Sequence, residues 1–319
     1  MTRWSIKRRP SSDFALIFPG QGAQFVGMGR DLYDGSSAAR AVFKEVDEAL
    51  SRPLSTLMFE GPDEELRETA NAQPAIMTVS LATLKALEER AEPDGLWRPA
   101  MMAGHSLGEY TALAVSGALE LGETARLVEE RGRLMQRACE MRPGTMAAII
   151  GLDQMTVEEI SRQAGTYVSN VNTGEQVVIS GEVLAVARAL DMASARGAKK
   201  AIPLRVGGAF HSGLMTPARD GLAEVVSGLN LRDPSVPIVA NMTAKPITKA
   251  SQLRRELVTQ VCECVQWKRS IEYMLGCGVT GFIEIGPGRT LSGMVKRISR
   301  SAEVKTVGDL DSVSNFSLN

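Results

Sequence analysis

The sequence predicts a mixed α/β protein with a mostly parallel sheet and a smaller inserted subdomain. Short apolar runs at 14–18, 99–103 and 281–285 end at glycine-containing turns, and helical patterns follow them. In the middle of the chain, short strands and helices follow one another in a different order. The length of 319 residues also exceeds the size at which one core usually stops growing.

The outer parts of the chain alternate strands and helices, which predicts one parallel sheet covered by helices. The expected strands are 14–18, 99–103, 237–240 and 281–285. The expected helices are 38–50, 74–89, 109–118, 123–141, 216–227, 251–260 and 291–299.

The middle segment reads β-α-β-β-α-β, with strands at 146–150, 167–171, 176–180 and 200–206 and helices at 156–163 and 183–196. This order is typical of a ferredoxin-like unit. We therefore expect a discontinuous core at 13–141 and 206–308, a ferredoxin-like subdomain at 142–205 and a C-terminal tail at 309–319. Residues 1–12 are expected to be a basic, disordered extension, because no apolar region of a secretion signal follows them.

The composition excludes several classes of function. A net charge of −1 gives no bulk field that favours nucleic acid or an anionic membrane. No apolar run approaches the roughly 18 residues of a membrane span. We expect a cytoplasmic protein with free thiols and no metal, because no histidine lies near the four cysteines in sequence and the spacing of Cys262 and Cys264 suits neither zinc nor disulfides. The four cysteines are Cys139, Cys262, Cys264 and Cys277. We also expect no cofactor.

The segment Gly104-His105-Ser106-Leu107-Gly108 matches the pattern G-x-S-x-G between an apolar strand and a helix. Such a strand-turn-helix lifts the serine hydroxyl out of the turn. Ser106 is therefore the candidate nucleophile. The backbone N–H of Leu107 is expected to point at the oxyanion that develops during attack.

A serine nucleophile needs a base, and the chain has two histidines. His105 is adjacent to Ser106, so its side chain is expected on another face of the turn. His211 lies in a glycine-flanked loop just after the inserted subdomain and is the better candidate.

Arg131 lies in the helix expected at 123–141, inside a stripe of apolar residues. Three other arginines of this helix, Arg126, Arg133 and Arg137, face the opposite side. A buried arginine needs an anionic partner. That partner is either a carboxylate of the protein or the carboxylate of a substrate, which a guanidinium can grip with two hydrogen bonds.

Together these segments resemble the malonyl-CoA:acyl carrier protein transacylase family. The resemblance extends from about Phe14 to about Val307. It is carried by Phe18-Pro19-Gly20-Gln21-Gly22-Ala23-Gln24, Ala72-Gln73-Pro74-Ala75, Gly104-His105-Ser106-Leu107-Gly108-Glu109-Tyr110, Arg131, Ala209-Phe210-His211-Ser212 and Glu284-Ile285-Gly286-Pro287-Gly288. It implies a hydrolase-like α/β core with a ferredoxin-like insert.

The resemblance also implies the roles of individual residues. Ser106 would take the acyl group, His211 would be the base, and Arg131 would bind the malonyl carboxylate. The remaining assignments are oxyanion-hole N–H groups from Gln21 and Leu107, a main-chain carbonyl near Gln260 that orients the histidine, and malonyl selectivity from Phe210. Cys264 stands where the family usually has proline, which predicts a looser loop around His211.

The implied reaction moves a malonyl group from a coenzyme A thioester to the phosphopantetheine thiol of an acyl carrier protein, for fatty-acid or polyketide synthesis. Two alternatives remain at this point: a hydrolase of the same fold that clears acyl groups from carriers, and an inactive carrier-docking module. The sequence indicates no particular oligomeric state.

Overall fold

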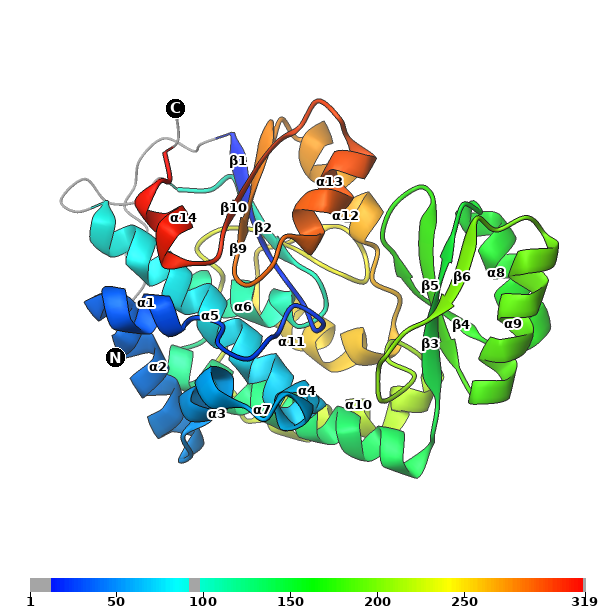
Figure 1. The fold of residues 1–319 in the computed structure, drawn as a ribbon, viewed down its shortest axis with the longest axis horizontal. Coiled ribbons are helices and arrows are strands. Elements are labelled where there is room, and N and C mark those ends of the chain that lie inside the picture. Colours follow the sequence, from blue (N-terminus) through cyan, green and yellow to red (C-terminus); the bar gives the residue numbers. More distant parts are fainter. Residues whose placement is uncertain (1–12, 92–97, 318–319) are drawn as a thin grey trace.

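The computed structural model describes residues 13–91 and 98–317, and Figure 1 shows its fold. The basic extension expected at 1–12 lies outside the described residues. Up to residue 141 the elements are β1 (Phe14–Phe18), α1 (Arg30–Gly35), α2 (Ser37–Leu50), α3 (Leu54–Glu60), α4 (Asp63–Arg67), α5 (Thr69–Arg90), β2 (Met101–Gly104), α6 (Gly108–Val115) and α7 (Leu121–Met141).

The middle of the chain contains β3 (Thr145–Ile150), α8 (Gln154–Ala164), β4 (Tyr167–Val171), β5 (Gln176–Gly181), α9 (Val183–Ala195) and β6 (Lys200–Pro203). The last part contains α10 (Thr216–Ser227), β7 (Ile238–Val239), β8 (Pro246–Ile247), α11 (Ala250–Thr259), α12 (Trp267–Gly276), β9 (Gly281–Ile285), α13 (Thr290–Ile298), β10 (Glu303–Val307) and α14 (Leu310–Ser314). Two short 3₁₀ turns occupy Gly213–Met215 and Gln260–Cys262.

The larger sheet has the strand order β10-β9-β1-β2-β7-β8. Every neighbouring pair is parallel except β7 and β8. The prediction of a mostly parallel sheet is therefore confirmed. The carboxyl ends of β1, β2, β7 and β9 lie at one edge of this sheet, where ligands usually bind in open α/β folds.

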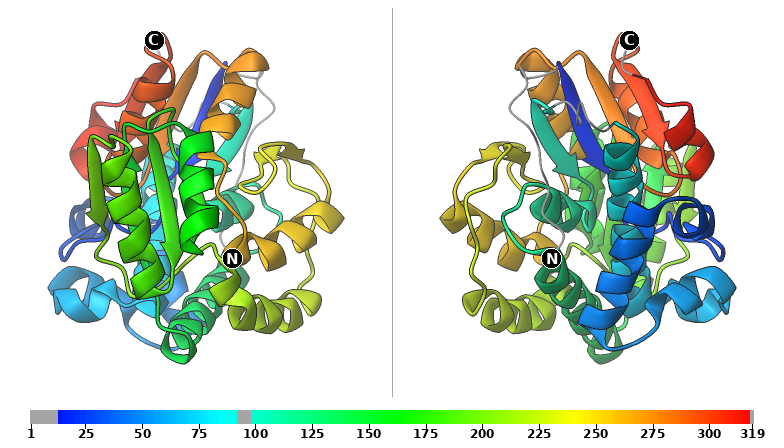
Figure 2. Two further views of the ribbon diagram at one scale, coloured as in Figure 1. Left: turned by 90° about the vertical axis from the view of Figure 1, so that its right-hand side faces the viewer. Right: turned by 90° about the vertical axis from the view of Figure 1, so that its left-hand side faces the viewer.

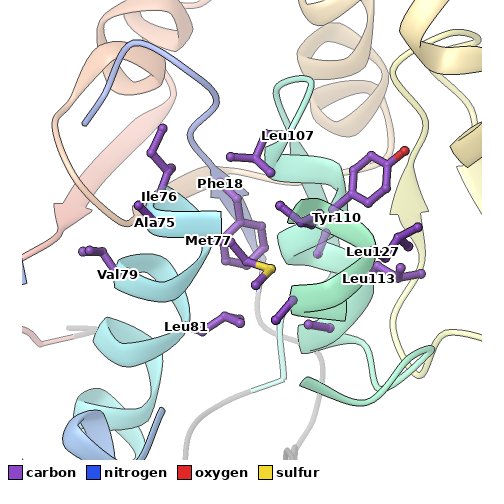
Figure 3. Packing of buried hydrophobic residues seen from close by; sticks show 14 of the residues in the cluster. Phe18, Ala75, Ile76, Met77, Val79, Leu81, Leu107, Tyr110, Leu113 and Leu127 are labelled. Carbon is purple, nitrogen blue, oxygen red and sulfur yellow. The ribbon is translucent and has the colours of Figure 1, made fainter. Parts of the chain in front are cut away.

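The central strand β1 packs on both faces, which explains its continuous apolar run. Leu16 and Phe18 belong to a cluster with α5, α6 and α7, whereas Ala15 and Ile17 belong to a second cluster with α12 and α13. Figure 3 shows Phe18 among side chains of α5 and α6, with Met77 close to its ring.

The smaller sheet is antiparallel, with the order β4-β5-β3-β6. Helices α8 and α9 cover its outer face, as Figures 1 and 2 show. A separate apolar cluster joins these helices to the sheet, through residues such as Val157 and Val186. The other face of this sheet is turned towards the larger sheet.

Several elements differ from the sequence-based expectation. Helix α5 begins at Thr69, five residues before the predicted start, and continues through Pro74. It is buried on all sides, so no amphipathic pattern marked its start. Helix α12 and strand β10 were not predicted. The C-terminal tail includes helix α14, whose Val313 is buried.

Within the part of the chain that the structure describes, no helix is both long enough and apolar enough to cross a lipid bilayer.

Candidate active site

Three neighbouring parallel strands bring three polar residues together at the carboxyl edge of the larger sheet. Gln21 follows β1, Ser106 follows β2 and Asn241 follows β7. The side chain of Asn241 ties the turn after β2 in place. Its Oδ1 accepts the Ser106 N–H at 2.7 Å, and its Nδ2 donates to the Gly104 carbonyl at 2.6 Å.

The turn at Ser106 is sharp and strained. Ser106 has φ of 51°, a left-handed conformation that is costly for a residue with a side chain. The two glycines of the motif allow this turn to form against its neighbours. A Cβ on Gly104 would come 1.8 Å from the backbone of Gly108, and a Cβ on Gly108 would come 2.1 Å from the Phe18 carbonyl oxygen. The geometry is that of a nucleophile elbow.

His211 faces Ser106 from the loop that follows the smaller sheet. Its Nε2 lies 2.8 Å from Ser106 Oγ. Its Nδ1 lies 2.9 Å from the Gln260 carbonyl oxygen and 3.1 Å from that of Glu263. Because carbonyl oxygens only accept, Nδ1 must carry the hydrogen, which leaves the Nε2 lone pair for the serine proton.

The electrostatic surroundings of His211 keep the ring neutral. Burial, and to a lesser extent the charge of Arg131, lower the pKa of His211 to about 3. The residue itself has φ of 55°, so the loop holds it in a strained conformation like that of the serine.

Arg131 is fully buried, as its place in the apolar stripe of α7 predicts. Its Nη2 donates to Ser106 Oγ at 3.1 Å and to Gln260 Oε1 at 2.8 Å, and its Nη1 donates to Gln73 Oε1 at 2.6 Å. Among the described residues, no carboxylate makes an ion pair with it, and its Nε has no partner. A guanidinium has five N–H donors. Three of them are engaged, and in the part of the chain that the structure describes the Nε hydrogen and one Nη1 hydrogen have no partner.

The side-chain amide of Gln260 connects Arg131 to a buried carboxylate. Its Nε2 donates to Glu109 Oε2 at 2.6 Å and to the Ser106 carbonyl at 2.9 Å. Glu109 Oε1 in turn accepts the Asn241 N–H at 2.9 Å. Burial and the neighbouring Glu256 raise the pKa of Glu109, whereas Arg131 and two hydrogen bonds oppose that shift.

A cavity of about 230 Å³ opens over these residues, between the larger sheet and the smaller one. Gln21, Ser106, Leu107, Arg131 and His211 line its polar side. Its apolar side is lined by Met135, Met146, Val178, Leu204, Val206 and Phe210. In the described part of the chain, the backbone N–H groups of Gln21 and Leu107 donate to no other group. Both are thus available to a ligand in the cavity.

The loop that contains Cys264 is fastened rather than loose. The Val265 N–H donates to the Ser169 carbonyl at 2.8 Å, and the Val171 N–H donates to the Val265 carbonyl at 2.9 Å. Residue 265 thereby pairs with strand β4. The prediction that Cys264 loosens this loop is wrong, because backbone pairing holds the segment without a proline.

His105 points away from the serine, as expected. Its Nε2 lies 2.9 Å from Asn172 Oδ1, and its ring packs against Trp267 at 5.6 Å between centroids. Asn172 follows β4, so this contact joins the turn at Ser106 to the smaller sheet.

Four residues of the site carried no role in the sequence interpretation: Gln73, Glu109, Asn172 and Asn241. Gln73 and Glu109 stand within motifs that were recognised, but the motifs do not show which neighbours they contact. Asn241 could have been found from its place directly after a buried strand.

Comparison with known proteins agrees with this geometry. A family model described as "Acyl transferase domain" matches residues 15–313. The chain belongs to the acyl transferase family. The family resemblance predicted from the motifs is confirmed, and the serine elbow, the facing histidine and the buried arginine lie within the matched region.

Two relatives of this acyl transferase are named malonyl CoA-acyl carrier protein transacylase. The *Bacillus subtilis* protein is 42% identical over 95% of both chains, and that of *Escherichia coli* K12 is 43% identical over 90% of this chain and 93% of its own.

Solved structures are similar over nearly the whole chain. An acyl-carrier-protein S-malonyltransferase from *Bartonella henselae* has a TM-score of 0.90 at 42% identity, covering 94% of this chain and 97% of its own. A malonyl-transacylase solved in complex with its type II PKS acyl-carrier protein has a TM-score of 0.89 at 40% identity. That match covers 95% of this chain and 98% of the solved chain.

Proposed function

We propose that this acyl transferase moves malonyl from malonyl-CoA to the phosphopantetheine thiol of an acyl carrier protein, through a malonyl ester on Ser106. The observation that carries the proposal is Arg131, a buried guanidinium that lines the cavity beside the serine and has donors left over. A malonyl group has a carboxylate to offer these donors. The names of the relatives support the same substrate and partner.

In the first half-reaction, His211 Nε2 takes the Ser106 proton while Oγ attacks the thioester carbon. The tetrahedral oxyanion would be held by the N–H groups of Gln21 and Leu107. Collapse of this intermediate breaks the carbon–sulfur bond, and coenzyme A leaves with the proton from His211. The Gln260 carbonyl orients the imidazole and accepts its Nδ1 hydrogen, in place of the aspartate of a catalytic triad.

In the second half-reaction, the carrier thiol gives its proton to His211 and attacks the malonyl ester. Ser106 Oγ then leaves and recovers that proton. Phe210, on the apolar side of the cavity, would contribute to the choice of malonyl. The substrates supply all the atoms of the transfer, so we propose that the reaction uses no cofactor or metal.

A hydrolase of uncharged acyl groups is the second candidate, and Arg131 argues against it. Such an enzyme would place an incompletely paired guanidinium against an apolar acyl chain, at a desolvation cost with no compensating contact. An inactive docking module has no need for a histidine held 2.8 Å from a strained serine.

The proposal predicts a covalent adduct. Incubation with malonyl-CoA should add one malonyl group, which intact-protein mass spectrometry would detect and peptide mapping would place on Ser106. Ser106→Ala should abolish the adduct at an unchanged melting temperature. A label on a cysteine, or release of free malonate at the rate of thioester cleavage without carrier, would contradict the proposed transfer.

We propose helix α13 as the docking surface for the carrier, because the family resemblance implies an acidic acyl carrier protein. Thr290, Leu291 and Met294 at its start line the cavity, and its later part exposes basic residues. Lys296 is engaged, because its Nζ donates to the Ala302 carbonyl at 2.8 Å. Reversal of charge at Arg297, in the helix, and at Arg300, two residues after its end, is therefore the cleaner test.

We predict that Arg297→Glu with Arg300→Glu raises the KM for carrier about tenfold and leaves the KM for malonyl-CoA unchanged. Steady-state kinetics with each substrate varied in turn would measure both values. Arg162→Glu on α8 with Arg196→Glu directly after α9 is the control pair, at the outer side of the smaller sheet. Equal effects of the two pairs would place the carrier elsewhere.

We further propose that residues 142–205 form a ferredoxin-like subdomain inserted into the core at 13–141 and 206–308. The strand order of the smaller sheet and its separate apolar cluster support this division. We propose a cytoplasmic location, which the four free cysteines support.

A further inference from the structure

Glu109 is a buried carboxylate on α6, three residues after the nucleophile, and no step of the proposed mechanism uses it. We propose that Glu109 is a positioning residue that fixes the orientation of the Gln260 side-chain amide, and through that amide aims Arg131 at the malonyl carboxylate. This inference rests on the proposed function and extends it to the residue that sets substrate selectivity from a distance.

The polarity of the Gln260 amide determines where Arg131 can be held. In the observed orientation, both Nε2 hydrogens go to acceptors, on Glu109 and on the Ser106 carbonyl, and Oε1 faces the guanidinium. The reversed orientation would place an NH₂ group against the guanidinium and an oxygen against two oxygens. All three hydrogen bonds would then be replaced by contacts between like groups.

Glu109 is one of the three groups that favour the observed orientation, together with the Ser106 carbonyl and the Arg131 guanidinium. It is 1% exposed, and its other oxygen is held by the Asn241 N–H. In the structure both carboxyl oxygens of Glu109 accept hydrogen bonds, one from the Asn241 N–H and the other from the Gln260 NH₂ group, so Glu109 faces the NH₂ end of Gln260. Burial and Glu256 raise the pKa of Glu109, and Arg131 opposes that shift, although the two groups meet through Gln260 rather than directly.

The arrangement separates two functions of Gln260. Its main-chain carbonyl orients His211, whereas its side chain holds Arg131. Glu109 acts on the side chain. Loss of the carboxylate should therefore weaken recognition of malonyl more than it weakens the serine–histidine chemistry, which is the same for malonyl and acetyl.

Glu109→Gln in the full-length protein tests this inference. The new NH₂ group faces the Gln260 NH₂ group whenever its oxygen stays with Asn241, so one of the three hydrogen bonds that hold the amide is lost and its hold on Arg131 is weakened. We expect the ratio of kcat/KM for malonyl-CoA over acetyl-CoA to fall at least tenfold, with acetyl transfer within about threefold of the wild type.

Glu256→Gln is the matched control. Glu256 is also buried and also accepts one backbone N–H, that of Met242 at 2.9 Å, but it does not bond to Gln260. It should leave the malonyl-to-acetyl ratio unchanged. A role of Glu109 in stability alone would lower both activities together, and that result would overturn the inference.

A double-mutant cycle isolates the route through Gln260. Gln260→Met removes the amide, so adding Glu109→Gln to it should change the ratio no further. Independent, additive effects would overturn the inference. If Glu109→Gln does not fold, Gln260→Met alone carries the test, because it must reproduce the loss of ratio. A wild-type protein that transfers no malonyl would instead refute the proposed function.

Discussion

His211→Ala is expected to slow the acylation of Ser106 by malonyl-CoA by about four orders of magnitude. Among the described residues, the imidazole is the one group within hydrogen-bond distance of Ser106 Oγ that can accept its proton, since Arg131 is a donor. Without it the serine hydroxyl is a weak nucleophile at neutral pH. Rapid-quench measurement of the malonyl-enzyme would give the rate of this half-reaction directly.

His105→Ala is the control for this change. His105 is adjacent to the nucleophile but bonds to Asn172, so its loss should cost far less than the loss of His211. The reverse ranking would show that the base is misassigned.

The pH dependence offers a second check on His211. Because its pKa is lowered to about 3, the imidazole stays neutral from pH 5 to pH 8, and the acylation rate should be flat over that range. A histidine with an ordinary pKa near 6.5 would lose about thirtyfold in rate between pH 8 and pH 5. A slope of that size would show that the site is more hydrated than the structure indicates.

Arg131→Ala is expected to reduce malonyl transfer by roughly two to four orders of magnitude. The change would remove the two charge-assisted hydrogen bonds that we propose Arg131 makes to the malonyl carboxylate, each worth about 1.5–3 kcal/mol. Acetyl transfer should change little, because acetyl offers no carboxylate. Arg131→Lys should rescue only in part, since a single ammonium cannot reproduce the planar fork.

The decisive quantity for Arg131 is the malonyl-to-acetyl ratio of kcat/KM. The alanine variant also leaves the amide oxygens of Gln73 and Gln260 without a donor, so its melting temperature should fall. Both substrates should therefore be assayed well below that temperature. A ratio that stays at the wild-type value would show that Arg131 supports the core and that selectivity lies elsewhere.

The nucleophile, the base and the buried arginine could be predicted because each is indicated by a pattern in the sequence itself. Ser106 stands in a motif between a strand and a helix, and the chain offers two histidines, one of which is the neighbour of the serine. Arg131 is marked by its place in an apolar stripe, which requires burial. These residues are identified by their neighbours in sequence or by the small number of histidines, so the sequence alone is enough to predict them.

The supporting contacts could not be predicted, because they join segments that are distant along the chain. Glu109 meets Gln260 across 151 residues, and Asn241 meets Ser106 across 135. The effect of Cys264 was misjudged for the same reason, since the pairing of Val265 with β4 depends on where the smaller sheet lies. Helix α12, by contrast, was visible in principle: Trp267, Ser270, Ile271 and Met274 are buried at helical spacing.

The loop of His211 follows the smaller sheet in the chain, and this order has a consequence for biosynthesis. A ribosome completes the serine turn long before the histidine, which comes 105 residues later, and the carbonyl that orients the histidine comes 49 residues after that. The growing polypeptide therefore displays an unactivated hydroxyl until the smaller sheet has been made and the segment around residue 260 has emerged. We therefore expect reactivity towards thioesters to begin only when these long-range contacts close, so that an unfinished chain resists acylation.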